Sequence, residues 1–136
     1  MTLVVDASAV TDLLVRSTRG EQVRAFLTKR ADEDVATVAH LDAEVFSALA
    51  RIHRADDLDA YEVAVLLGRL GELAVTRLPI TTTLLHAAWG LRDNVSARDG
   101  LYVAAAQALS AGLVTTDDRL ARAVPDVAID LDGGLS

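Results

Sequence analysis

The sequence predicts an α/β fold of three layers, in which helices cover both faces of a doubly wound, mainly parallel sheet. Two observations support this prediction. Short runs that are almost wholly apolar alternate along the chain with longer segments whose apolar residues recur at helical spacing. In addition, the predicted strands do not alternate apolar and polar residues, and such strands are typical of parallel sheets that helices cover on both faces.

The first quarter of the chain predicts two strands with two helices between them. Residues 3–5 form an apolar, β-branched run that we expect to be the first buried strand, and residues 35–38 form a second such run. Between them, helical spacing of apolar residues predicts a helix around residues 10–14 and another over residues 21–29. This order gives the first strand–helix–strand crossover of a parallel sheet.

The middle of the chain predicts three helices and a third strand. Apolar residues recur at helical spacing over residues 41–52, and acidic residues suit the start of a further helix over residues 57–73. Residues 75–80 are a strand candidate. A helix over residues 81–91 is expected to begin at Thr81, because a threonine side chain can cap a helix N-terminus.

The last third of the chain predicts one long helix and three shorter elements. The long helix is expected over residues 97–111, between Ser96 as its N-cap and Gly112 as its stop. A strand, a short helix and a last strand are then predicted over residues 113–115, 117–124 and 127–131.

Composition favours a single globular domain over residues 1–136. The chain is 51% hydrophobic, which suffices for a buried core. The longest uncharged run, residues 100–116, falls short of the ~20 residues that a membrane helix needs, so we expect no membrane span. The chain contains no cysteine, which excludes a thiolate metal site and a thiol nucleophile. A cytoplasmic protein is the simplest expectation.

The net charge of −7 is unusual for a protein that binds nucleic acid. If four carboxylates belong to one metal site, the rest of the chain carries a charge of only −3. All but one of the 13 basic residues are arginine, whose guanidinium group can bind a phosphate through two hydrogen bonds. Composition therefore neither supports nor excludes an RNA partner, and it predicts a weak overall electrostatic attraction.

Four acidic residues are expected to meet at one edge of the sheet. In open parallel sheets, ligands bind outside the carboxyl ends of the strands. Asp6 directly follows the first predicted strand, and Asp117 closely follows the strand over residues 113–115. Glu44 and Asp99 each lie in or near the first turn of a helix that begins near the same edge. The four carboxylates should therefore converge.

Such a cluster needs a cation. Two carboxylates ~5 Å apart repel each other by roughly 3 kcal/mol at an effective dielectric constant of ~20. A site that offers only carboxylate oxygen and water suits Mg²⁺ or Mn²⁺ better than zinc. Ions of this kind polarise a phosphodiester and activate water for its hydrolysis.

Four short segments that carry these acids resemble, in order, the motifs of the PIN-domain family. They are D-A-S-A at 6–9, A-E-V-F-S-A-L at 43–49, R-D-G-L-Y-V-A-A-A at 98–106 and T-T-D-D-R-L-A at 115–121. The chain length is similar to that of VapC-type toxins of toxin–antitoxin pairs. One departure is that Arg98 and Gly100 flank Asp99, where family members often have an aromatic residue and an alanine.

The resemblance implies an endoribonuclease that depends on Mg²⁺ or Mn²⁺ and cleaves RNA phosphodiesters. Its catalytic and metal-binding residues would be Asp6, Glu44, Asp99 and Asp117, with Thr115 as a candidate helper. It also implies a homodimer, which agrees with apolar helix faces beyond those that one thin sheet can cover. A small antitoxin protein would cover the acidic cleft.

Several neighbouring polar residues are alternatives within this site. Asp42 is the alternative to Glu44, although the motif favours Glu44. Asp118 is expected at the surface, next to Asp117, and Asp12 is expected on the surface of a helix. Asn94 either caps the entry to the long helix or contacts the site, and the sequence leaves both interpretations open.

Two other function classes share parts of this pattern. Phosphoryl-accepting α/β domains also place an aspartate after the first strand. Receiver domains need in addition a lysine after a late strand, whereas the only lysine here is Lys29. Phosphatases of the haloacid dehalogenase type need a second aspartate two residues after the first, where this chain has Ser8. The third class is a PIN-like domain that binds RNA or protein without catalysis.

Overall fold

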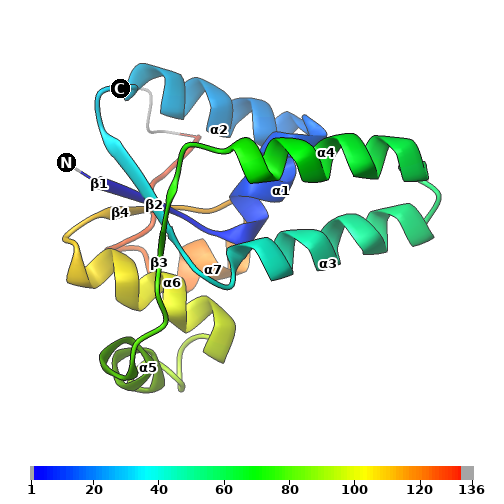
Figure 1. The fold of residues 1–136 in the computed structure, drawn as a ribbon. Helices are drawn as coiled ribbons and strands as arrows, with labels where there is room; N and C mark the ends of the chain where they lie inside the picture. The colour runs from blue at the N-terminus through cyan, green and yellow to red at the C-terminus, as the bar shows by residue number, and fades with distance from the viewer. Residues whose placement is uncertain (1, 133–136) are drawn as a thin grey trace.

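A four-stranded parallel sheet forms the centre of the protein (Figure 1). The computed structural model describes residues 2–132. The strands are β1 (Thr2–Val5), β2 (Asp34–Val38), β3 (Thr76–Leu78) and β4 (Gly112–Val114), in the spatial order β3-β2-β1-β4. All three strand pairs are parallel. Because the chain first builds outward on one side of β1 and then returns to place β4 on the other side, the sheet is doubly wound, as predicted.

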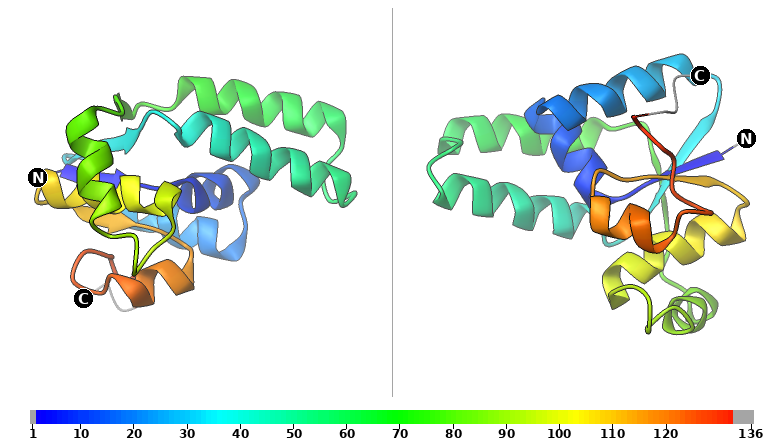
Figure 2. Two further views of the ribbon diagram at one scale, coloured as in Figure 1. Left: turned by 90° about the horizontal axis from the view of Figure 1, so that it is seen from below. Right: turned by 180° about the vertical axis from the view of Figure 1, so that it is seen from behind.

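Helices cover both faces of this sheet. They are α1 (Ala7–Val15), α2 (Thr18–Lys29), α3 (Leu41–Arg54), α4 (Ala60–Glu72), α5 (Thr82–Trp89), α6 (Ala97–Ala108) and α7 (Asp118–Ala123). Figures 1 and 2 show α1 to α4 on one face and α5 and α6 on the other. The pair α3 and α4 forms a helical hairpin that extends beyond the sheet. The three-layer architecture predicted from the sequence is therefore confirmed.

Side-chain caps fix where several helices begin. The hydroxyl of Thr81 accepts a hydrogen bond from the backbone N–H of Leu84 at the start of α5, and Ser96 caps α6 in the same way. Asp6 and Asp117 are the N-caps of α1 and α7. Caps of this kind satisfy backbone donors that have no partner inside the helix. Two of the predicted acidic residues therefore also start helices.

The C-terminal part of the chain differs from the prediction in two ways. The long helix ends at Ala108, and Ser110 adopts a positive φ of 51° that takes the chain out of the helix. The prediction of a strand over residues 127–131 is wrong, because this segment forms only a single parallel bridge, between Ala128 and Leu113. A turn in which Asp130 accepts a hydrogen bond from the backbone N–H of Asp132 follows directly and prevents further pairing.

Most of the long uncharged run of the sequence lies inside the protein. The α6 residues from Gly100 to Ala106 are all buried, residues 107–110 are exposed at the end of the helix, and β4 then enters the sheet. Among the helices formed by residues 2–132, none combines the length and the apolar character that a membrane span requires. The run is therefore a buried helix and a buried strand joined by an exposed turn.

Candidate active site

Asp6 is a buried carboxylate at the junction of β1 and α1. Its side chain is 2% exposed. Its Oδ1 accepts hydrogen bonds from the Ser8 hydroxyl at 2.7 Å and the backbone N–H of Ala9 at 2.9 Å. Burial, with a smaller contribution from the charge of Asp99, raises the pKa of Asp6 to about 6, although hydrogen bonds from Thr115, Ala9 and Ser8 act in the opposite direction. Asp6 is therefore costly to keep ionised in the absence of a cation.

Thr115 joins this carboxylate to the end of β4. Its hydroxyl donates to Asp6 Oδ2 at 2.5 Å and accepts from the backbone N–H of Asp117 at 3.1 Å. The Ser8 hydroxyl lies 3.0 Å from the Thr115 hydroxyl and accepts from the backbone N–H of Thr116 at 3.0 Å. Because β1 and β4 are the two strands between which the sheet reverses its order, this network lies where ligands bind in doubly wound folds.

Asp99 is the residue through which the acidic cluster is coupled. It lies in the first turn of α6, and its backbone N–H donates to the Ser96 hydroxyl at 3.3 Å. Partial burial raises the pKa of Asp99, the Ser96 hydrogen bond lowers it, and the charges of Asp117 and Glu44 raise it again. Since Asp99 in turn raises the pKa of Asp6, Asp99 is coupled electrostatically to each of the other three predicted acids.

Asp117 and Asp118 have different surroundings. Asp117 Oδ1 accepts hydrogen bonds from the backbone N–H groups of Arg119 at 3.0 Å and Leu120 at 3.1 Å. Asp118 forms an exposed ion pair with Arg19, with 3.0 Å between Nη1 and Oδ1. Asp117 therefore caps α7 and lies near enough to Asp99 to raise its pKa, whereas Asp118 lies on the surface.

Glu44 is held by three side chains. Its Oε1 accepts a hydrogen bond of 2.8 Å from the Tyr102 hydroxyl and lies 3.4 Å from His40 Nε2, and its Oε2 lies 3.4 Å from Arg98 Nε. Burial, followed by the bond to Glu44, raises the pKa of Tyr102 above its ordinary range. The ring of His40 also stacks on Tyr102, with 4.4 Å between centroids. The phenol is therefore a permanent donor to Glu44.

Ser8, His40 and Tyr102 contact the site although the sequence analysis did not include them. Each lies at a distance in sequence from one of the predicted acids that could have indicated its contact with the site. Ser8 is two residues after Asp6, and the other two are one helical turn from an acid, with His40 four residues before Glu44 and Tyr102 three residues after Asp99.

The structure also separates the alternatives near the site. Asp42 forms two hydrogen bonds with Arg77 of β3, at 2.7 and 2.9 Å, and therefore links α3 to the sheet. Asp12 is more enclosed than expected, because it accepts from the Thr116 hydroxyl at 2.5 Å and from Ser17 at 2.9 Å. The side-chain amide of Asn94 donates to the carbonyl of Ala123 at 2.8 Å and does not cap α6.

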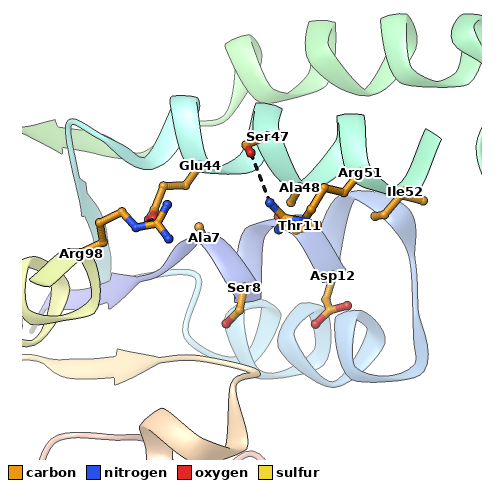
Figure 3. Close-up of a pocket in the computed structure, with 10 residues that line it drawn as sticks. All are labelled: Ala7, Ser8, Thr11, Asp12, Glu44, Ser47, Ala48, Arg51, Ile52 and Arg98. Carbon is orange, nitrogen blue, oxygen red and sulfur yellow. Dashed lines mark hydrogen bonds and ion pairs between the residues drawn. The ribbon is translucent and has the colours of Figure 1, made fainter. Parts of the chain in front are cut away.

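Two cavities flank the acids. The α1–α3 cavity, of about 380 Å³, is lined by Ala7, Ser8, Thr11, Asp12, Glu44, Ser47, Ala48, Arg51, Ile52 and Arg98 (Figure 3). The α6–α7 cavity, of about 450 Å³, is lined by Arg92, Asp93, Asn94, Val95, Ser96, Asp99, Asp117, Arg119, Leu120 and Ala123. Glu44 therefore faces one cavity, and Asp99 and Asp117 face the other.

The chemistry of the donors fits a hard divalent cation. The four acids offer only oxygen, which Mg²⁺ and Mn²⁺ prefer. Within residues 2–132, however, no three acidic or histidine side chains are already arranged to hold one ion. Oδ1 of Asp6 and of Asp117 faces backbone N–H groups, and Glu44 is bound to Tyr102. A metal would therefore have to draw these side chains together.

Comparison with known proteins identifies the family. The PIN domain model matches residues 3–124. Ribonuclease VapC3 of Mycobacterium tuberculosis is 46% identical over 124 residues, which are 90% of this chain and 88% of that protein. The crystal structure of FitAcB from Neisseria gonorrhoeae superposes with a TM-score of 0.70 at 25% identity and covers 94% of this chain and 95% of that chain.

A third comparison concerns the fold alone. The structure of VapBC2 from Rickettsia felis, bound to a DNA fragment from their promoter, has a TM-score of 0.66 at 14% identity and covers 96% of this chain and 98% of that chain. The matched family model spans most of the chain and includes all four of the predicted acids. The protein belongs to the PIN-domain family and is a relative of the VapC ribonucleases.

Proposed function

We propose that this protein is a metal-dependent endoribonuclease that acts in the cytoplasm as the toxin of a toxin–antitoxin pair. The observation that carries the proposal is the electrostatic coupling of four carboxylates from four elements at the reversal point of the sheet. Repulsion between neighbouring carboxylates is unfavourable for folding, whereas a bound cation offsets it. The similarity to the VapC ribonucleases supports RNA as the substrate.

In this proposal Asp6, Glu44, Asp99 and Asp117 hold Mg²⁺ or Mn²⁺. When bound, such an ion offsets the charge of a phosphodiester and lowers the pKa of water. The chain itself orients the carboxylates. Ser8 and Thr115 direct the two oxygens of Asp6, and Tyr102 directs Glu44. Among residues 2–132, Asp6 pairs with no basic side chain, so its charge remains available to a metal.

We also propose that the protein forms a homodimer and binds a small antitoxin that covers the acidic cleft. Large apolar side chains remain exposed on three helices, including Phe46 (55%) on α3, Tyr61 (78%) on α4 and Trp89 (64%) on α5. Exposed apolar surface of this kind commonly marks a protein interface. The single chain leaves Trp89 outside the core, which favours a contact role for it.

The decisive experiment is cleavage of a labelled single-stranded RNA by the purified protein with Mg²⁺, with Mn²⁺ and with chelator. We expect cleavage only with metal, and loss of cleavage in Asp99→Asn. The matched control is Asp118→Asn, which removes the same charge from an exposed ion pair and should cleave normally. If Asp99→Asn cleaves as fast as the parent with the same metal dependence, the proposed site is wrong.

The toxin role has a separate test in cells. Expression of the parent should arrest growth, whereas Asp99→Asn should accumulate without arresting it. Co-expression of the neighbouring small reading frame should restore growth and allow both proteins to be purified together. Light scattering of the purified chain at tens of micromolar, on the scale where weak dimers form, should give the mass of a dimer. If the purified protein binds RNA but never cleaves it, the non-catalytic alternative is supported instead.

A further inference from the structure

The first turn of α6 separates the two cavities beside the acids. Arg98 lines the α1–α3 cavity, whereas the next residue, Asp99, lines the α6–α7 cavity. Consecutive residues on a helix point about 100° apart, so this division follows from helical geometry. The first turn of α6 therefore lies between the two cavities, with Glu44 in the lining of one and Asp99 and Asp117 in the lining of the other.

Arginines gather in the α1–α3 cavity. Arg98 lies beside Glu44, and Arg51 lies farther along α3, next to Ser47 and Thr11 (Figure 3). Arg51 donates a hydrogen bond of 3.2 Å to the Ser47 hydroxyl. The buried hydroxyl oxygen of Thr11 has no hydrogen-bond partner among the described residues. This cavity therefore offers the cationic side chains of Arg51 and Arg98 to a ligand.

The α6–α7 cavity has a matching pair of arginines, Arg92 and Arg119. The guanidinium of Arg92 lies 4.8 Å from the ring centroid of Trp89, which is exposed. Within residues 2–132, Arg51, Arg92 and Arg119 take part in no ion pair, whereas Arg98 pairs with Glu44. Arg54, Arg69 and Arg122 are unpaired as well, so the distinguishing feature of the cavity arginines is their place beside the acids. In a chain of net charge −7, cationic side chains in both cavities favour an anionic ligand with more than one charge.

We propose that a single RNA strand lies across the first turn of α6, with Arg51 and Arg98 binding phosphates on one side of the cleaved bond and Arg92 and Arg119 binding phosphates on the other. This inference rests on the proposed ribonuclease function and adds the path of the substrate. Guanidinium groups bind phosphate through paired hydrogen bonds.

The path explains how an acidic protein binds a polyanion. Carboxylates line both cavities and would repel RNA, but a metal bound to the four proposed acids would offset the charge at the cleaved bond. On both sides of that point the strand contacts arginine. Binding is then local and depends on particular arginines, so that a general positive surface is not required.

The test compares Arg51→Gln and Arg119→Gln with Arg54→Gln. Arg54 is an exposed residue at the end of α3, three residues after Arg51 and outside both cavities, so its variant is a control with the same charge change. Binding of a labelled single-stranded oligoribonucleotide is measured by anisotropy with Ca²⁺, and cleavage is measured with Mn²⁺.

Each cavity variant should weaken RNA binding about tenfold, the equivalent of one lost charge-assisted hydrogen bond. The slope of log affinity against log salt should decrease by about 0.7 for each variant. In cleavage, KM should rise while kcat stays close to that of the parent, because the lost contact binds substrate and transition state alike. Arg54→Gln should match the parent, and Arg51→Lys should recover the salt slope.

Shortened RNAs then assign each arginine to one side of the cleaved bond. Removal of nucleotides from one end should abolish the effect of Arg51→Gln and preserve that of Arg119→Gln, and removal from the other end should do the reverse. The path is overturned if one shortening abolishes both effects, if both variants behave like Arg54→Gln, or if the parent binds no RNA.

The same data separate this inference from the proposed function. If the parent cleaves RNA but the cavity variants bind it normally, the path is wrong and the nuclease stands. If the parent never cleaves but the two-sided pattern appears, the path stands and the nuclease is wrong. Equal melting temperatures of all variants exclude misfolding as the cause.

Discussion

The Thr115 hydroxyl donates a 2.5 Å hydrogen bond to Asp6 Oδ2 and so connects the carboxyl ends of the two strands between which the sheet reverses its order. The bond stabilises the ionised form of Asp6 but does not offset the cost of its burial. The protein without metal therefore contains a carboxylate whose charge opposes folding.

The first prediction is that Asp6 makes metal-free stability fall as pH rises. The pKa of Asp6 is about 6 in the folded protein and 3.8 ordinarily, so the folded state binds the proton more tightly. This contribution is fully present below pH 3.8 and is lost as the pH rises through about 6. The loss amounts to about 3 kcal/mol of unfolding free energy. Urea unfolding in chelator from pH 4 to 7 should show it as a difference between the parent and Asp6→Asn.

The second prediction is that Asp6→Asn stabilises the metal-free protein at pH 7. Asparagine keeps the N-cap acceptor for α1 while it removes the buried charge. We expect an increase of roughly 1–3 kcal/mol in the free energy of unfolding. Asp118→Asn is the control, because it removes an exposed charge and should change stability by less than about 0.5 kcal/mol. A clear loss of stability in Asp6→Asn would make Asp6 a structural acid.

The third prediction is that divalent metal raises the melting temperature. A cation that binds only the folded state adds about 2.7 kcal/mol at 100 times its dissociation constant, which is roughly 8–10 °C for a domain of this size. Mg²⁺ and Mn²⁺ should produce this shift in the parent, and Asp99→Asn should lose most of it. A melting curve that is the same in chelator and in millimolar Mn²⁺ would argue against a metal site.

The fourth prediction concerns Tyr102 as a positioning residue. Tyr102→Phe preserves the buried ring but removes the donor to Glu44, which should cost about 1.5 kcal/mol of stability. The metal concentration that gives half-maximal cleavage should also rise, because Glu44 is no longer held in place. Tyr61→Phe, at a residue that is 78% exposed, is the matched control. A merely structural Tyr102 would lower stability and leave the metal dependence unchanged.

Local signals in the sequence were sufficient for most of the fold. Caps at Thr81 and Ser96 and the apolar strands were predictable because they depend on a few adjacent residues. The strand expected over residues 127–131 failed because the neighbouring turn at Asp130, and not the apolar pattern, decides how far the chain pairs with β4.

The acids of the candidate site were predictable from where they follow strands and begin helices, but their partners were not. Asp42 and Glu44 are two residues apart on α3, and only the position of Arg77 on β3 shows that Asp42 has a structural role. In the same way, the hydrogen bond from Tyr102 of α6 to Glu44 of α3 depends on how these two helices pack. Contacts between distant segments define the surroundings of the site.

The dual position of Asp6, at the end of a strand and at the cap of α1, constrains which replacements would remove the proposed toxicity and still allow folding. If Asp6 holds the proposed metal, asparagine, serine or threonine at this position keeps a cap while it removes the acid, so we expect an inert protein that still folds. Alanine or valine remove the cap together with the acid. Selection for survivors that retain the folded protein, and with it the capacity to sequester the antitoxin, should therefore enrich the first group over the second.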